Sequence, residues 1–270
     1  MKKIYFILAI LLQSLSLLAQ SGSVTLKQVI KLEIPREGGA NGASVAWHPI
    51  QKKYYAAMAG NVSFCMGVYD IKGTRLSPKE QETMFDVRGF WYNPATKSLQ
   101  MNGYDDFGWA EYKLNSNGLP ISVDVLQEGK NQPTEQSAGA FNPKENLIYF
   151  LNESGEVEIY DAKTRNYQEK LELKIGYEEY ERIDDDDFET LFNDNYNTTS
   201  IIYTGMKGAE LGLLNIQQNV IELYNASTGY LTRTLILPAG APSFEWLNFS
   251  YTNGIYFLFN KETRIWHGYK

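Results

Sequence analysis

Five short phrases, each carrying one aromatic residue, recur along this chain and constrain its fold more than any other feature. They are Gly67-Val-Tyr69-Asp70, Ala110-Glu-Tyr112-Lys113, Glu158-Ile-Tyr160-Asp161, Glu222-Leu-Tyr224-Asn225 and Arg264-Ile-Trp266-His267. Their aromatic residues are 43, 48, 64 and 42 positions apart, and each phrase reads as the end of a β-strand. A period of this length is typical of a unit of four antiparallel strands that repeats around an axis.

Turn signals divide each repeat into short strands, most clearly in the third repeat. There, residues 142–146 (Asn-Pro-Lys-Glu-Asn) and 154–155 (Ser-Gly) form turns, and the runs between them are rich in β-forming residues. Turn prolines also keep the period, because Pro49, Pro94 and Pro143 are 45 and 49 positions apart. Five such repeats predict an all-β chain folded as a five-bladed β-propeller with four-stranded antiparallel blades.

The fifth repeat is one strand short, because the sequence given stops after its third strand. Residues 27–35 (Lys-Gln-Val-Ile-Lys-Leu-Glu-Ile-Pro) resemble the outer strand of the fourth repeat, residues 231–238 (Leu-Thr-Arg-Thr-Leu-Ile-Leu-Pro). We therefore expect Val29 to Ile34 to pair with Arg264 to Tyr269, so that the N-terminal strand closes the ring and removes two exposed sheet edges.

Several of these segments resemble the repeats of the WD40-like and YVTN-type β-propeller superfamily. The resemblance is carried by His48-Pro49-Ile-Gln-Lys-Lys-Tyr54-Tyr55, Asn142-Pro143-Lys-Glu-Asn-Leu-Ile-Tyr149, Tyr69-Asp-Ile-Lys-Gly-Thr-Arg75 and Tyr160-Asp-Ala-Lys-Thr-Arg165. The Trp-Asp and Gly-His pairs of true WD40 repeats are absent. Since the superfamily includes binding proteins and enzymes, the resemblance implies the fold and leaves the activity open.

The first 20 residues have the pattern of a secretory signal peptide. A pair of lysines precedes the apolar residues 4–12, and a small-residue cleavage site follows at residues 17–20. An uncleaved membrane anchor is the alternative, but polar residues from Gln13 onward leave the apolar stretch short of the about 20 residues of a spanning helix. We expect a secreted or periplasmic protein in which residues 21–270 form one domain, with no membrane insertion after the leader is removed.

Composition narrows the classes of partner. The net charge of −7 argues against nucleic acid, whose binding depends on lysine and arginine side chains that neutralise phosphates. The single cysteine, Cys65, lies in the apolar run from Val62 to Val68, which predicts a buried, inert thiol. Nothing in the sequence demands a second domain or a second subunit, so we expect a monomer.

Inner strands line the channel of a propeller and offer aromatic and polar side chains there. The candidate ligand-binding residues are Trp47, His48, Trp91, Tyr92, Phe141, Trp246 and Asn248. Aromatic faces around a pore suit stacking on a sugar ring or clamping a peptide, because they give a large contact area with little loss of side-chain entropy. Packing between blades is the alternative role for each ring. The expected partner is a glycan, a peptide or a protein.

Glycoside hydrolysis would require paired carboxylates on different inner strands, as five-bladed glycosidases use. The candidates are Asp86, Asp105, Asp106 and Glu245, and two of them would have to lie within about 5 to 10 Å across the channel. A Ser-His-Asp triad is poorly supported, since the chain has only two histidines. His48 reads as structural and His267 as an exposed turn residue. The catalytic residues of any activity are therefore unknown.

An acidic segment, residues 174–195, holds nine acidic and two basic residues. Its run Asp184, Asp185, Asp186 and Asp187 could bind Ca²⁺, but it lacks the glycine and the distant glutamate of an EF-hand loop, so a solvated loop is the favoured interpretation. No cofactor is otherwise expected. The sequence predicts a non-catalytic binding or interaction propeller, with a carbohydrate-active or lactone-hydrolysing enzyme as the alternative.

Overall fold

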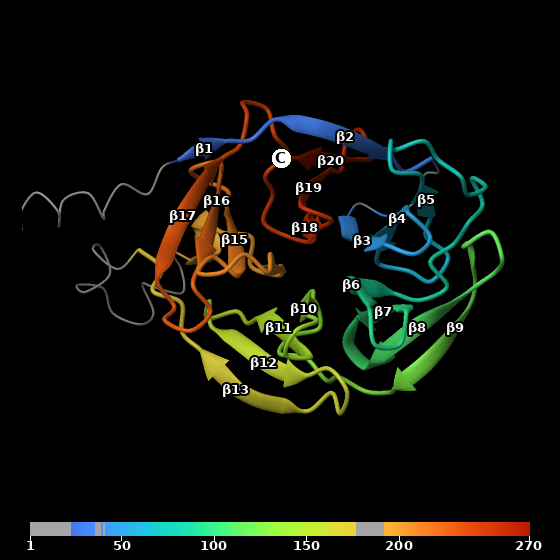
Figure 1. The fold of residues 1–270 in the computed structure, drawn as a ribbon, viewed down its shortest axis with the longest axis horizontal. Coiled ribbons are helices and arrows are strands. Elements are labelled where there is room, and N and C mark those ends of the chain that lie inside the picture. Colours follow the sequence, from blue (N-terminus) through green and yellow to red (C-terminus); the bar gives the residue numbers. More distant parts are fainter. Residues whose placement is uncertain (1–22, 36–38, 40, 177–191) are drawn as a thin grey trace, which may run out of the picture.

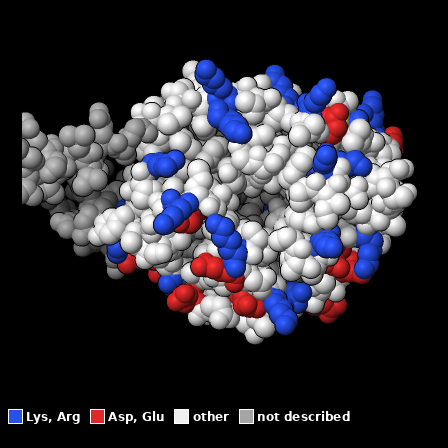
Figure 2. Space-filling model, in the orientation of Figure 1, with Lys and Arg blue, Asp and Glu red and all other residues white. Residues whose placement is uncertain are grey.

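The computed structural model describes residues 23–35, 39, 41–176 and 192–270. Five small antiparallel sheets stand around a central channel and form the five blades of a propeller (Figure 1). The fold class expected from the repeat is therefore confirmed. On the face drawn in Figure 2, most charged side chains lie toward the periphery, and mainly uncharged residues surround the hollow at the centre.

Each blade begins with its innermost strand. Blade 1 contains β3 (Asn41–His48), β4 (Lys53–Ala59) and β5 (Met66–Tyr69). Blade 2 contains β6 (Val87–Asn93), β7 (Ser98–Gly103), β8 (Trp109–Leu114) and β9 (Pro120–Gln127), with the short 3₁₀ helix η1 (Asp105–Phe107) between β7 and β8. Blade 3 contains β10 (Ala140–Asn142), β11 (Leu147–Leu151), β12 (Val157–Asp161) and β13 (Tyr167–Leu171).

The last two blades receive strands from the start of the chain. Blade 4 contains β14 (Ile202–Tyr203), β15 (Leu211–Asn215), β16 (Val220–Tyr224) and β17 (Leu231–Ile236), with β1 (Val24–Thr25) on its outer edge. Blade 5 contains β18 (Phe249–Thr252), β19 (Ile255–Asn260), β20 (Ile265–Tyr269) and, as its fourth strand, β2 (Gln28–Glu33).

The pairing of β2 with β20 confirms ring closure by the N-terminal strand. The register runs from Gln28 opposite Tyr269 to Glu33 opposite Ile265, and the antiparallel ladder ends at the Ile34 N–H, which donates to the Arg264 carbonyl at 2.9 Å. β1 was not predicted: it pairs in parallel with β17, so the start of the chain runs along two blades (Figure 1).

The recurring aromatic residues occupy the third strand of each blade, as the repeat predicts. They are Tyr69 on β5, Tyr112 on β8, Tyr160 on β12, Tyr224 on β16 and Trp266 on β20, and all are buried. Two of the hydroxyls reach another blade: the Tyr69 hydroxyl donates to the Glu33 carbonyl at 2.5 Å, and the Tyr112 hydroxyl donates to the Thr83 carbonyl at 2.6 Å.

The hydrophobic core lies mainly between neighbouring blades. Leu32 of β2, Tyr54 of β4, Phe257 of β19 and Trp266 of β20 pack in one cluster between blades 5 and 1. Inward-facing residues alternate with outward-facing ones along β2, where Leu32 is fully buried. None of the helical segments in the described part of the chain has the length and apolar character needed to span a bilayer.

The innermost strands set the two mouths of the channel. β3, β6, β10, β14 and β18 contact one another in ring order, and Ala138 and Ser200, just before β10 and β14, form a parallel bridge. The five strands therefore run in the same direction along the channel. We call the end where they begin the N-side mouth and the end where they finish the C-side mouth.

Candidate binding site at the C-side mouth

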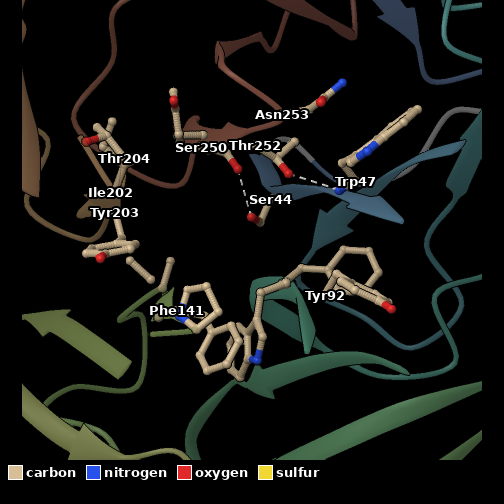
Figure 3. Close-up of a pocket in the computed structure, with 18 of the residues that line it drawn as sticks. Ser44, Trp47, Tyr92, Phe141, Ile202, Tyr203, Thr204, Ser250, Thr252 and Asn253 are labelled. Atoms are coloured by element: carbon tan, nitrogen blue, oxygen red, sulfur yellow. Dashed lines mark hydrogen bonds between the residues drawn. The ribbon is translucent and has the colours of Figure 1, made fainter. Parts of the chain in front are cut away.

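A pocket of about 310 Å³ opens where the inner strands end, and every blade contributes to it (Figure 3). Eight aromatic residues line it. Phe90 and Phe249 belong to the buried core, and the other six are Trp47 of β3, Trp91 and Tyr92 of β6, Phe141 of β10, Tyr203 of β14 and Tyr251 of β18. Each of these six rings stands at or near the end of its strand because the turn that follows leads the chain away from the channel. The repeat thus places one or two rings per blade around the opening.

Most of these rings are backed by a second ring. Trp47 packs on Tyr54 with centroids 4.5 Å apart, and Tyr251 packs on Tyr256 at 4.8 Å. Tyr203 stacks on Tyr149 at 5.8 Å with an interplanar angle of 22°. These supporting contacts fix the orientation of half-buried rings before any ligand arrives, which reduces the entropy lost on binding.

The hydroxyls of the small side chains in the pocket are already used within the fold. Ser44 and Ser250 share a hydrogen bond of 3.0 Å, and the backbone N–H of Trp47 donates to the Thr252 hydroxyl at 3.0 Å (Figure 3). The Thr204 hydroxyl donates to the Ala209 carbonyl at 2.7 Å. These bonds join strands and turns of blades 5, 1 and 4, so they hold the pocket wall together.

The tyrosine hydroxyls and one lysine remain available to a ligand. Within the described residues, the hydroxyls of Tyr92, Tyr203 and Tyr251 have no hydrogen-bond partner. Burial raises the pKa of Tyr203 to about 12 and also raises the pKa of the other two, so all three stay protonated at neutral pH and can donate. Lys144 is the one charged residue among those that line the pocket.

The structure brings together four of the seven ring and polar candidates: Trp47, Trp91, Tyr92 and Phe141. Trp91 is only 6% exposed, and its indole Nε1 is buried without a hydrogen-bond partner, so it offers the pocket a wall and no accessible donor. His48 lies behind the pocket, where its ring packs on Tyr92 at 4.6 Å. The Gln51 N–H donates to its Nδ1 at 3.4 Å, which fits the structural role expected from the sequence.

Trp246 and Asn248 lie at the opposite, N-side mouth. The sequence interpretation placed Trp246 on the inner strand of blade 5, but β18 begins at Phe249. The Asn197 side chain explains the difference: its Nδ2 donates to the Phe244 carbonyl at 2.9 Å and to Asn248 Oδ1 at 2.9 Å, which holds the preceding segment as a loop. Asn248 Nδ2 donates to the Pro242 carbonyl at 3.1 Å, so both polar atoms of this amide are engaged.

The candidate carboxylates are not gathered at this pocket, since none of them lines it. Asp86 is buried and accepts from Arg88 Nη1 at 2.6 Å and from the Gly60 N–H at 2.7 Å. Asp105 and Asp106 belong to η1 beside blade 2, and Glu245 lies by the N-side mouth. Their positions give no carboxylate pair at the C-side mouth.

His267 is not a turn residue, because β20 continues through it to Tyr269. Pairing with β2 extends the strand, and His267 Nδ1 lies 2.9 Å from Gln28 Oε1. Residues 184–187, the candidate calcium ligands, lie outside the described residues. Among the described residues, no three His, Cys, Asp or Glu side chains come together as a metal site.

No family model matches the sequence, and no curated protein matches it. Among solved structures, the glutaminyl cyclase of Myxococcus xanthus is similar with a TM-score of 0.53 and 6% identity, over 92% of this chain and 98% of that one. A chain of a nidogen/laminin complex is similar with a TM-score of 0.43 and 11% identity; the match covers 75% of this chain and 66%, just under two thirds, of that chain. The chain has the β-propeller fold. Identities this low show the fold alone.

Sequence reasoning missed Tyr203, Tyr251 and Lys144 as pocket residues. Tyr203 ends β14 and Tyr251 stands one residue before the end of β18, close to the places that Trp47 and Phe141 occupy on β3 and β10. Aligning the ends of all five inner strands would have found the two tyrosines. Lys144 follows the turn proline of blade 3, and nothing in the sequence marks it as facing the channel.

Proposed function

We propose that this protein is an exported, non-catalytic binding propeller that holds a sugar unit of a glycan at the C-side mouth. The observation that carries the proposal is a pocket lined by aromatic rings from all five blades, with no carboxylate among its lining residues. Export rests on the leader pattern of the first 20 residues.

A pyranose has the chemistry that this pocket complements. Its C–H faces pack on aromatic rings, and its hydroxyl oxygens accept hydrogen bonds. The hydroxyls of Tyr92, Tyr203 and Tyr251 and the ammonium group of Lys144 supply donors around the rings. The volume of about 310 Å³ is at the lower end for small-ligand sites, which suits a single sugar unit better than a long chain.

At the C-side mouth, the arrangement of the acidic groups favours binding over catalysis. Glycoside hydrolysis requires two carboxyl groups on either side of the scissile bond, about 5 to 10 Å apart. Neither Asp86, which is paired with Arg88, nor Glu245 lines the C-side pocket. The likeness to the Myxococcus xanthus enzyme concerns the fold, so it does not favour catalysis in this chain.

The test is a glycan array probed with the chain that starts at residue 21, followed by calorimetry on the glycans that bind. Tyr203→Ala should weaken binding at least about tenfold, because a preorganised ring in a binding site carries a large share of the affinity. Tyr203→Phe should retain the stacking and lose one donor, so its affinity should fall between the two.

The matched control is Tyr167→Ala, the same truncation at an exposed tyrosine on the outer strand β13. It should bind within about twofold of the wild type, since it lies on the outermost strand, away from the channel. No binding to any glycan, or unchanged binding by Tyr203→Ala, would contradict the proposal. Binding to a peptide library at the same tyrosine would keep the site and replace the ligand class.

A further inference from the structure

The N-side mouth holds two adjoining hollows that share no residue with the C-side pocket. The larger, of about 700 Å³, lies against the loops that lead into β10, β14 and β18, and the smaller, of about 240 Å³, lies on the blade 5 side. Asn41, Trp246 and Leu247 line both. Trp246 therefore stands at the junction of a surface that is longer than either hollow alone.

Trp246 is unusually exposed for a tryptophan, and the backbone around it is held by hydrogen bonds. Its side chain is 60% exposed, whereas the next residue, Leu247, is buried. The Leu247 N–H donates to the Thr199 hydroxyl at 2.9 Å, and the Thr198 N–H donates to the Glu245 carbonyl at 3.0 Å. These bonds hold Leu247 in the left-handed region with φ of 39°, a conformation that branched residues rarely adopt. These bonds therefore fix the backbone that carries the exposed indole.

Amide and hydroxyl side chains line the same two hollows as this indole. Asn41, Thr134, Gln136, Thr198 and Ser243 line one or other of the two hollows. Gln136 is held in place, because its Oε1 accepts from Arg88 Nε at 2.8 Å, and Arg88 is itself buried and paired with Asp86. This leaves the Gln136 amide nitrogen to donate to a ligand oxygen.

Charges around the two hollows are nearly balanced. The lining residues include two lysines, Lys130 and Lys261, and three glutamates, Glu135, Glu153 and Glu245. Of these, Glu135 interacts electrostatically with the buried Arg88. A surface with so small a net charge attracts a polyanion or a polycation only weakly. Charge complementarity therefore favours a neutral ligand.

We propose that the N-side mouth is a second glycan site, which binds a neutral oligosaccharide long enough to cross both hollows, with one sugar ring stacked on Trp246. An exposed indole flanked by planar amides and hydroxyls matches a pyranose, because the sugar offers an apolar face and a rim of hydroxyls. The proposal goes beyond the function proposed for the C-side pocket, since it concerns other residues, another face and a longer ligand.

The experiment uses the chain from residue 21 and four neutral linear hexasaccharides: cellohexaose, laminarihexaose, mannohexaose and xylohexaose. Calorimetry should show that at least one binds, and that Trp246→Ala weakens it at least about tenfold, as expected for a central aromatic residue. Trp246→Phe should stay within about threefold, because a smaller ring still stacks. Unfolding curves should show all variants folded, since Trp246 is largely exposed.

Matched variants separate this proposal from the function proposed for the C-side pocket. Tyr203→Ala should leave hexasaccharide binding at Trp246 unchanged, since Tyr203 lines only the other pocket. The inference is overturned if none of the hexasaccharides binds, or if Tyr203→Ala abolishes binding and Trp246→Ala spares it; the latter result would still support the C-side site. Tighter binding of charged hexasaccharides, such as chitosan or oligogalacturonate, would overturn the neutral ligand class.

Discussion

Blades 1 and 5 both lack a fourth strand that directly follows the third in sequence, and the outer edge of the third strand is covered differently in each. In blade 5 the fourth strand is β2, which arrives from the start of the chain and pairs in register with β20. In blade 1 the chain continues past Tyr69, but residues 75–84 run irregularly along β5. They touch it through the Cys65–Glu82 and Tyr69–Arg75 bridges and through single hydrogen bonds.

The difference shows what a fourth strand has to provide. In blade 1 it is enough that the edge of β5 finds partners: the Met66 N–H donates to the Gln81 carbonyl at 2.9 Å, and the Val68 N–H donates to the Ser77 hydroxyl at 3.1 Å. In blade 5, Ile30 and Leu32 of β2, and Ile34 directly after it, also enter the core between blades 5 and 1. Irregular chain can satisfy an edge, but closing the ring requires a strand with an apolar face.

The largest expected effect comes from removing β2. A chain that starts at residue 35 loses the burial of Ile30, Leu32 and Ile34, at about 1.5–3 kcal/mol each, which rivals the whole stability of a domain at about 5–15 kcal/mol. It also exposes the edge of β20, so we expect an aggregating protein. Size-exclusion chromatography and thermal unfolding measure both effects.

The matched control is a chain that starts at residue 26, which lacks β1 and keeps β2. β1 contributes only two residues, both exposed, to the edge of blade 4, so this chain should remain soluble. If the chain from residue 35 were monomeric and melted within about 3 °C of the control, equivalent to about 1 kcal/mol, ring closure by β2 would not be what stabilises the propeller.

The second largest loss of stability is expected at Tyr69, which links blade 1 to β2 of blade 5. Tyr69→Ala should destabilise the protein by about 3–5 kcal/mol through the cavity that it leaves. Tyr69→Phe should cost only about 1 kcal/mol, because it removes just the hydrogen bond from the Tyr69 hydroxyl to the Glu33 carbonyl of β2. Urea unfolding measures both, with Tyr167→Ala as an exposed control on β13. Equal losses at Tyr69 and Tyr167 would show that the recurring ring is not a core residue.

A smaller effect is expected in the irregular segment of blade 1. Val68 is fully buried, and Ser77→Ala removes the hydrogen-bond acceptor of its backbone N–H. The free energy of unfolding should fall by about 1–3 kcal/mol. Ser116→Ala, in an exposed turn, should change the free energy of unfolding by less than about 0.5 kcal/mol. If the two variants were equally stable, the segment from 75 to 84 would not act as the substitute for a strand.

Much of the fold could be predicted from the sequence because turn chemistry and the third-strand ring repeat with the blade. Closure followed from the likeness of residues 27–35 to residues 231–238, which occupy equivalent outer positions. β1 could not be predicted, because two residues in parallel pairing leave no periodic pattern.

The candidate site was harder to predict. The repeat assigns a residue to an inner strand, but it does not say at which mouth of the channel that residue lies. Trp47 and Trp246 both read as inner-strand rings, but Trp47 stands near the end of β3 and Trp246 precedes the start of β18. The loop that holds Trp246 depends on the Asn197 amide, which is 49 positions away in sequence. The two mouths therefore separate only once the strand bounds are known.

The smallest expected effect is a dependence of stability on pH. It involves one histidine in each of the two blades, His48 in blade 1 and His267 in blade 5. Burial, aided by Lys53, lowers the pKa of His48 from 6.5, and burial, aided by Lys31, lowers that of His267. Because the unfolded chain then binds more protons just below pH 6.5, the free energy of unfolding should fall as pH drops through that value toward the folded pKa of each histidine. Asp70 and Asp161 do not contribute in this window, since backbone N–H groups lower their pKa from 3.8.

Urea unfolding at pH 7.5 and pH 5.5 should show this loss of stability at the lower pH. His48→Gln should reduce the loss more than His267→Gln, since His48 is only 4% exposed. A wild-type protein equally stable at both pH values, or a loss that neither substitution changes, would show that these histidines titrate alike in the folded and unfolded chain.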